Sequence, residues 1–192
     1  MVTTATEAVA KLREGNRRFM DAVGSRDASR LSNYLEDGLV QVQRPIAVVV
    51  GCADSRVPAE RVFDQGPGDL FVVRTAGNLV GPLQTGSIEF ALLNFGPPLI
   101  VVLGHSECGA VRSAIEGSSD GLPPALGAVV DGVQANIGDE GNLDTAIKVN
   151  TRAVAASLEA TSAVVGDAVQ EGSVEIIAAE YAISTGAVEF FD

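Results

Sequence analysis

The sequence predicts an α/β fold with a mainly parallel central sheet of four strands, an antiparallel edge strand and helices on both faces. Residues 46–50, 70–73, 99–103 and 174–178 are almost continuous apolar runs. Between them lie segments whose apolar residues recur at helical spacing. Strands that are apolar throughout and alternate with helices are typical of a parallel sheet covered on both faces.

The other elements follow from apolar spacing and from breaks at Gly, Pro and polar residues. Helices are expected at residues 9–23, 31–39, 88–93, 125–137 and 143–169, the last with a break near Gly166. Residues 117–124 are expected to be a loop. A turn at residues 184–186 leads into a short last strand at residues 187–191.

Size and charge limit the classes of function. The 192 residues are 46% hydrophobic and 20% charged, which fits one domain spanning residues 1–192. Residues 1–40 form a helical arm that either joins this domain or packs on a partner subunit. A net charge of -12 argues against a nucleic acid or an anionic membrane surface as partner. With no secretory signal and no long apolar run, the cytoplasm is expected.

All the thiols and imidazoles of the chain fall in two short segments. Cys52 follows the first predicted strand, and the third is followed by His105 and Cys108. Ligands of open α/β sheets bind beyond the carboxyl ends of the strands, so these residues converge if the two strands are neighbours. Two thiolates and one imidazole suit zinc, and three protein ligands leave a position open for water. This pattern predicts a catalytic metal site.

Less specific interpretations exist for the same residues. Free cysteine is often a buried small apolar residue, and a lone histidine is most often structural. Asp54 and Arg56 form either a surface ion pair of about 0–1 kcal/mol or a pair that orients solvent at the metal. A phosphate-binding cysteine loop is disfavoured because Asp54 would repel phosphate. Dinucleotide, Walker and nucleophile-elbow motifs are absent from the sequence.

The two segments resemble those of β-class carbonic anhydrases with a plant-type active site. The resemblance rests on CADSRV at residues 52–57 and GHSECGAV at 104–111. It extends to PIAVVVG at 45–51, GDLFVVRTAGN at 68–78, GSIEF at 86–90 and the segment 181–188. It therefore covers nearly the whole chain.

The resemblance implies a zinc enzyme that reversibly hydrates carbon dioxide to bicarbonate and a proton, by attack of a zinc-bound hydroxide. One zinc per subunit would be held by Cys52, His105 and Cys108, and an Asp54–Arg56 dyad would orient the hydroxide. Gln43, Phe71 and Gly109 match substrate-binding positions of the family. The family also implies a homodimer or dimer of dimers, with sites at the subunit boundary and the N-terminal arm over the neighbour.

Some family members are switched off when the dyad aspartate replaces water on zinc, and these bind bicarbonate in a pocket of Trp, Arg and Tyr. Arg74 and Tyr181 match two of these residues, but Val49 stands at the tryptophan position. We therefore expect that this pocket is absent and that Asp54 rests on Arg56. Two thiolate ligands predict an alkaline-shifted activity profile, and a lone histidine spent on zinc leaves no imidazole to shuttle protons.

Two rival functions stay open at this point. A zinc-binding or scaffold protein could keep the fold without turnover, although the intact Gln43, Asp54 and Arg56 argue against it. A related hydrolase of carbonyl sulfide or carbon disulfide is the other rival. Such relatives tend to depart from the family around the dyad and the His-x-x-Cys segment, and this chain does not.

Overall fold

The computed structural model of the chain describes residues 3–27 and 42–191. Its strands are β1 (Ala47–Cys52), β2 (Leu70–Thr75), β3 (Leu99–His105), β4 (Glu175–Tyr181) and β5 (Val188–Phe190), in the sheet order β2-β1-β3-β4-β5. Strands β1 to β4 pair in parallel, and β5 pairs antiparallel to β4. The predicted mainly parallel sheet with an antiparallel edge strand is confirmed.

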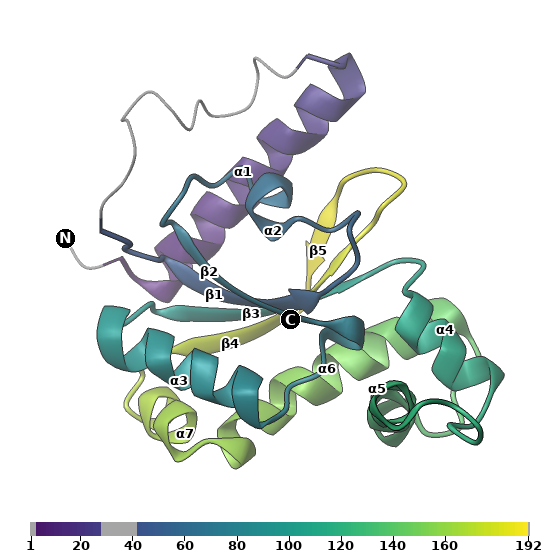
Figure 1. The fold of residues 1–192 in the computed structure, drawn as a ribbon. Helices are drawn as coiled ribbons and strands as arrows, with labels where there is room; N and C mark the ends of the chain where they lie inside the picture. The colour runs from purple at the N-terminus through teal and green to yellow at the C-terminus, as the bar shows by residue number, and fades with distance from the viewer. Residues whose placement is uncertain (1–2, 28–41, 192) are drawn as a thin grey trace.

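Helices cover both faces of this sheet (Figure 1). They are α1 (Ala5–Ser25), α2 (Ala59–Val62), α3 (Pro82–Phe95), α4 (Gly109–Glu116), α5 (Pro124–Ile137), α6 (Leu143–Thr161) and α7 (Ala163–Gln170), with a 3-10 turn η2 (Ala76–Asn78). The helix expected at residues 31–39 lies outside the described residues. Among the described helices, none has the length and hydropathy needed to cross a membrane.

Alternate strand residues supply the two halves of the core. Val49 and Val101 pack with residues of α1 and α2 on one face, whereas Val48, Val50 and Val102 pack with residues of α3, α6 and α7 on the other. All five are fully buried, which is why β1 and β3 read as unbroken apolar runs. A third cluster of buried residues joins α4, α5 and α6 around the carboxyl ends of β1 and β3.

The break in the long C-terminal helical segment lies at Ser162, so the prediction of a break near Gly166 was wrong. The hydroxyl of Ser162 accepts from Val165 N at 3.2 Å and caps α7. Gly166 is instead part of α7, where a Cβ atom would lie 3.1 Å from the carbonyl oxygen of Glu159. The absence of a side chain at Gly166 thus allows α7 to lie close to the end of α6.

Helix α1 packs against its own chain. A capping box between Thr4 and Glu7 begins the helix. Buried Asn16 donates to Val62 O at 3.0 Å and to Gly186 O at 2.8 Å, and its Oδ1 accepts from Val188 N at 2.9 Å. These bonds join α1 to α2 and to the start of β5, and a contact between the arm and a partner subunit stays a prediction.

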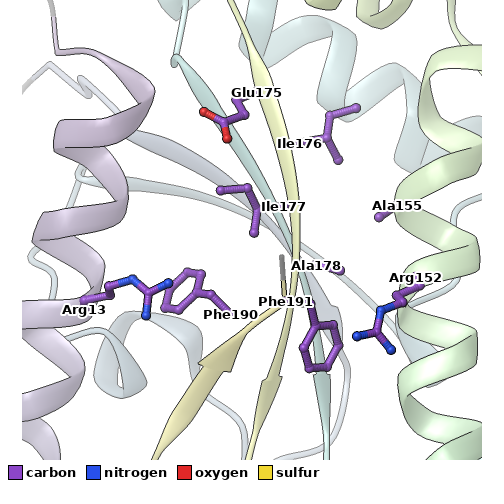
Figure 2. A pocket seen from close by; sticks show the side chains of 9 residues that line it. All are labelled: Arg13, Arg152, Ala155, Glu175, Ile176, Ile177, Ala178, Phe190 and Phe191. Atoms are coloured by element: carbon purple, nitrogen blue, oxygen red, sulfur yellow. The ribbon is translucent and has the colours of Figure 1, made fainter.

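The last strand is held between α1 and α6 by stacked arginines. Figure 2 shows Arg13 beside Phe190 and Arg152 beside Phe191, on either side of a pocket of about 380 Å³ at the sheet edge. The guanidinium carbons lie 4.5 Å and 4.3 Å from the two ring centroids. Cation–π contacts of this kind fix the edge strand to both faces of the sheet.

Candidate metal centre

Cys52, His105 and Cys108 meet at the carboxyl ends of the two central strands. Cys52 ends β1, His105 ends β3, and Cys108 precedes the first residue of α4. Their candidate ligand atoms all lie within 4.8 Å of one another, and all three residues are buried. β1 and β3 are neighbours, while β2 lies on the other side of β1, so the cluster occupies the point where the strand order switches.

His105 presents one nitrogen to the two cysteines. Its Nδ1 lies 2.9 Å from the carbonyl oxygen of Ser106, which assigns the ring proton to Nδ1. Among the described residues, no group meets hydrogen-bond geometry with the fully buried Nε2, whose neighbour is the Cys52 thiol. Buried polar atoms are nearly always paired, and metal-binding histidines typically donate their other ring N–H to a carbonyl. The orphaned Nε2 beside two sulfurs therefore fits a metal ligand.

The two thiols shift each other's pKa in opposite directions. A hydrogen bond from Cys108 lowers the pKa of Cys52 against the effect of burial, with further lowering by His105 and by the backbone N–H groups of Asp54 and Gly77. The same contact, together with burial, raises the pKa of Cys108. A cation with a preference for sulfur would bind both thiolates and release the remaining proton. The donor set fits zinc.

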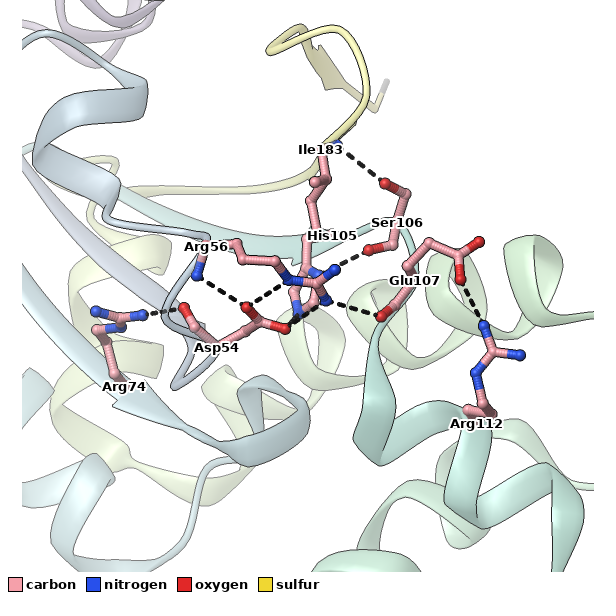
Figure 3. Close-up of polar contacts among 8 residues, drawn as sticks. All are labelled: Asp54, Arg56, Arg74, His105, Ser106, Glu107, Arg112 and Ile183. Carbon is pink, nitrogen blue, oxygen red and sulfur yellow. Dashed lines mark hydrogen bonds and ion pairs between the residues drawn. The ribbon is translucent and has the colours of Figure 1, made fainter.

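Asp54 stands beside this cluster and is held by Arg56 (Figure 3). Arg56 N and Nε donate to Oδ1 at 2.9 and 3.0 Å, and Nη2 donates to Oδ2 at 2.7 Å. These bonds lower the pKa of Asp54 to about 2 although burial opposes the shift. Arg56 Nη2 also donates to the carbonyl oxygen of Glu107 at 3.2 Å, which joins the segments that carry the ligands. The expected contact between Asp54 and Arg56 is present.

Arg74 makes contacts that the sequence did not predict. Its Nε donates to Cys52 O at 2.9 Å and its Nη2 to Asp54 O at 2.6 Å. The resemblance to regulated family members matches this arginine to an anion pocket that we expect to be absent here. In the structure it instead contacts the backbone on both sides of Ala53.

Gly109 lies at the cluster, but Gln43 and Phe71 do not. Gly109 is the first residue of α4, directly after Cys108. In the register of β1 and β2, Phe71 pairs with Val48, whereas Cys52 pairs with Thr75. Phe71 is therefore four residues, or about 13 Å along the strand, from the position opposite Cys52. Gln43 precedes the start of β1, and its neighbour Arg44 donates a backbone bond to Gly68 O just before β2. Gln43 therefore lies at the end of the sheet opposite Cys52.

Sequence reasoning also missed a buried amide that supports the site. Asn150 is completely buried on α6. Its Nδ2 donates to Gly77 O at 3.0 Å, and its Oδ1 accepts from Asn136 Nδ2 at 2.8 Å. The available signal was its helical spacing from the buried apolar residues Ile147 and Val154, which places an amide on the buried face of the helix.

A comparison with known families decides to which family the chain belongs. The sequence model of the family described as carbonic anhydrase matches residues 47–188, a stretch that includes Cys52, His105 and Cys108. The chain belongs to the β-class carbonic anhydrase family. It is therefore a carbonic anhydrase by family, an enzyme class that hydrates carbon dioxide.

Curated carbonic anhydrases and solved structures agree with this membership. Carbonic anhydrase 2 of Mycobacterium tuberculosis is 38% identical over 191 residues, covering 96% of this chain and 91% of that protein. A carbonic anhydrase of Pseudomonas aeruginosa is 32% identical over 182 residues, covering 87% and 82%. The Coccomyxa β-carbonic anhydrase in complex with acetazolamide superposes with a TM-score of 0.71 at 25% identity, covering 92% of this chain and 82% of that one.

A further structural relative is described as a tetramer. This β-carbonic anhydrase from Sordaria macrospora superposes with a TM-score of 0.66 at 25% identity, covering 78% of this chain and 81% of its own. Oligomers thus occur among the structural neighbours of this carbonic anhydrase.

Proposed function

We propose that this carbonic anhydrase reversibly converts carbon dioxide and water to bicarbonate and a proton, with one zinc per subunit bound by Cys52, His105 and Cys108. The observation that supports zinc most directly is the buried, unpartnered Nε2 of His105, which lies within 4.8 Å of both sulfurs. A bound zinc supplies a Lewis acid that lowers the pKa of water, and three protein ligands leave room for that water.

In this proposal Asp54 and Arg56 orient the attacking water. Asp54 Oδ2 lies 3.9 Å from His105 Nε2, so the carboxylate borders the position where solvent would sit. Because Arg56 keeps Asp54 ionised, the carboxylate accepts a hydrogen bond and cannot donate one. A fixed acceptor would select one orientation of the water, with an O–H toward Asp54 and a lone pair free to face carbon dioxide.

Gly109 is proposed to contact bicarbonate through its backbone N–H. It lies in the first turn of α4, where backbone N–H groups lack helical partners and favour an anion. A Cβ at this position would meet no atom within 4 Å, so crowding within the chain does not require glycine here. The absence of a side chain leaves this N–H open to a ligand.

A second copy of the chain is proposed to complete the substrate pocket. Gln43 and Phe71 lie at the far end of the sheet from their own Cys52, so only another subunit can bring such residues to the metal. Phe71 packs 6.4 Å from Phe90 and 6.2 Å from Phe95, measured between ring centroids. These aromatic residues lie beside an exposed surface of helix α3.

The exposed surface of α3 supports this assembly. Leu83, Phe90 and Leu93 are 83%, 51% and 72% exposed, and together with exposed Gly86 they form one stripe along the helix. The opposite face of α3 buries Ile88, so the helix is apolar on both sides. A helix that is apolar all round is normally buried, and we propose that the stripe lies against a second subunit in a homodimer or dimer of dimers.

We also propose a cytoplasmic location. Cys52 and Cys108 are free and buried, and a zinc site made from them needs reduced thiols. The cytoplasm keeps thiols reduced.

The proposed function is tested by metal analysis and stopped-flow hydration of carbon dioxide on the purified full chain. We expect one zinc per subunit, loss of activity with a chelator and recovery when zinc is restored. Cys108→Ser should lose zinc and activity together, whereas Ser118→Ala, in the exposed loop after α4, should keep both. Zinc without hydration would favour a scaffold, and hydrolysis of carbonyl sulfide or carbon disulfide without hydration would favour the related hydrolases.

A further inference from the structure

We infer that Arg74 is a positioning residue, which holds the backbone of residues 52–57, here called the ligand loop, so that Asp54 faces the metal site. The inference deepens the proposed function, on which it rests, because it assigns a residue that acts through Asp54. It starts from the two hydrogen bonds of Arg74 to carbonyl oxygens within this loop.

The ligand loop leaves the sheet where regular strand pairing ends. The last pair in the register of β1 and β2 is Cys52 with Thr75, and one more bond follows from Ala53 N to Thr75 O at 3.1 Å. Within the part of the chain that the structure describes, Asp54 therefore has no strand partner. Its position depends on the bonds that its own carbonyl and carboxylate groups make.

Arg74 provides the side-chain bond to the carbonyl oxygen of Asp54, beside one backbone bond. This oxygen accepts from Arg74 Nη2 at 2.6 Å and from Val57 N at 3.0 Å. The second bond of Arg74, from Nε to Cys52 O at 2.9 Å, ties the same guanidinium to the residue that carries a candidate ligand. The spacing between the Cys52 and Asp54 peptides is thus set by one rigid group.

Two arginines consequently hold Asp54 from two sides, as Figure 3 shows. Arg56 binds the carboxylate, and Arg74 binds the main-chain carbonyl. Loss of Arg74 would leave the carboxylate bonded to Arg56, but only backbone bonds from Ala53 N and Val57 N would then hold the pair relative to Cys52. Geometry at a reacting centre is sensitive to small displacements, so this freedom should lower turnover without releasing the metal.

Arginine is the side chain suited to this task. Its planar guanidinium presents several N–H donors in a fixed geometry, whereas lysine offers one compact ammonium on a flexible stem. Arg74→Lys can replace one of the two bonds but not their fixed spacing. Because Arg74 is exposed, its replacement should leave the core intact.

The test compares Arg74→Gln and Arg74→Lys with the wild-type holoenzyme. We expect Arg74→Gln to keep its zinc and its melting temperature, to lower kcat about 10-fold or more and to change KM less than about 2-fold. Arg74→Lys should recover part of kcat. Hydrogen exchange in a peptide covering the ligand loop should be faster in Arg74→Gln, and the sulfur-to-metal absorption of the cobalt-substituted protein should shift.

Arg112→Gln is the matched control, because it removes the same charge near the same site. Arg112 Nη2 donates to the carboxylate of Glu107 instead of to the ligand loop. We expect exchange in the ligand loop and kcat to stay within about 2-fold of wild type in this variant. Equal losses in Arg74→Gln and Arg112→Gln would mean that Arg74 acts by charge, and would overturn the inference.

An Asp54→Asn background separates action through Asp54 from direct action on substrate. Adding Arg74→Gln to Asp54→Asn should then lower kcat by less than about 2-fold, because the carboxylate that Arg74 positions is already lost. Full additivity would overturn the inference. If the wild type binds zinc but does not hydrate carbon dioxide, the proposed function fails, while loop exchange and the cobalt spectrum still report whether Arg74 positions the loop.

Discussion

Asp54 places its Oδ2 3.9 Å from the unpartnered Nε2 of His105 and 2.7 Å from Nη2 of Arg56. The carboxylate thus borders the cluster of ligand atoms while Arg56 holds both of its oxygens. Three hydrogen bonds from a single arginine give the carboxylate a defined direction. A change in that direction, or in the charge of the carboxylate, should therefore alter catalysis.

Replacement of Asp54 should reduce turnover more than metal binding. Asp54→Asn keeps the shape of the side chain but presents an amide donor on one side. We expect kcat to fall about 10- to 100-fold with zinc content unchanged, measured by stopped-flow hydration and metal analysis. Arg56→Gln should give a similar loss, and the double variant should be little worse than either single variant. Loss of zinc in Asp54→Asn would instead indicate that Asp54 is itself a zinc ligand.

The pH profile should rise toward alkaline pH without a contribution from Asp54. The folded pKa of Asp54 is about 2, below its ordinary value of 3.8, so the carboxylate is ionised at neutral pH and loses its charge only as the pH falls toward 2. Two thiolates donate more charge to a metal than imidazoles do, so the activating ionisation should lie above about 7. Asp54→Asn should lower the plateau of kcat/KM without moving its midpoint.

Two measurements would contradict this account of the pH profile. One is a flat kcat/KM between pH 6 and 9, and the other is a midpoint that shifts in Asp54→Asn. Because His105 is the only histidine and lies in the metal cluster, turnover should also rise with buffer concentration. Independence from buffer at low millimolar concentration would indicate another proton acceptor.

Thr151 should leave no room for a side chain at Gly104, the residue before the candidate ligand His105. A Cβ atom on Gly104 would lie 2.1 Å from Thr151 Oγ1, and both residues pack where β3 meets α6. Gly104→Ala should therefore displace the residue that precedes His105, destabilising the fold by about 1–3 kcal/mol and weakening zinc affinity. Removing the hydroxyl in Gly104→Ala/Thr151→Ala should restore part of the stability and part of the zinc affinity, measured by denaturant unfolding and metal titration. No rescue would argue against this contact.

The sequence was sufficient to predict the sheet and the cluster of ligands. The runs at β1 and β3 are buried on both faces, so they show no alternation and are easily recognised as strands of a parallel sheet. Once these strands are neighbours, Cys52 and His105 meet without further information. Helix α4 was not predicted, since it spans only eight residues and begins at a glycine.

Contacts that depend on register could not be predicted from the sequence. The distance of Phe71 from Cys52 follows from the pairing of β2 with β1, and no residue pattern fixes that pairing. Likewise, Arg74 reaches Cys52 O only because the strand pair places Gly51 opposite Arg74. The position of the α6–α7 break does not follow from the glycine, because the capping hydroxyl of Ser162 begins α7 while Gly166 lies inside this helix.

Substitution on the exposed face of α3 should separate the subunits and reduce activity together. Leu93 is 72% exposed, and Leu93→Asp would place a charge in the proposed interface without disturbing the core. We expect a smaller species by sedimentation and a loss of carbon dioxide hydration, because Phe71 would no longer reach the neighbouring site. Leu126→Asp, on helix α5 at 50% exposure, is the control and should change neither. A fully active monomer would contradict the shared pocket.

Glu180 should make stability depend on pH. Its side chain is 12% exposed, and burial raises its pKa above the ordinary 4.5, although Lys148 Nζ at 3.7 Å opposes the shift. A raised folded pKa means that the protonated form is favoured by folding, so this stabilisation is present below about pH 4.5 and is lost as the pH rises through the folded pKa. Neighbouring Asp144 and Glu189 add to the rise.

Glu180→Gln should therefore raise the melting temperature at pH 8 and have little effect at pH 4. The neutral amide avoids the cost of a buried charge, and Lys148 keeps Glu189 as a partner at 3.3 Å. Thermal unfolding of variant and wild type at each pH cancels any loss of metal that both share. Glu189→Gln is the control, since Glu189 is 67% exposed and its ion pair contributes little. A lower melting temperature of Glu180→Gln at pH 8 would show that the ion pair with Lys148 outweighs burial of the charge.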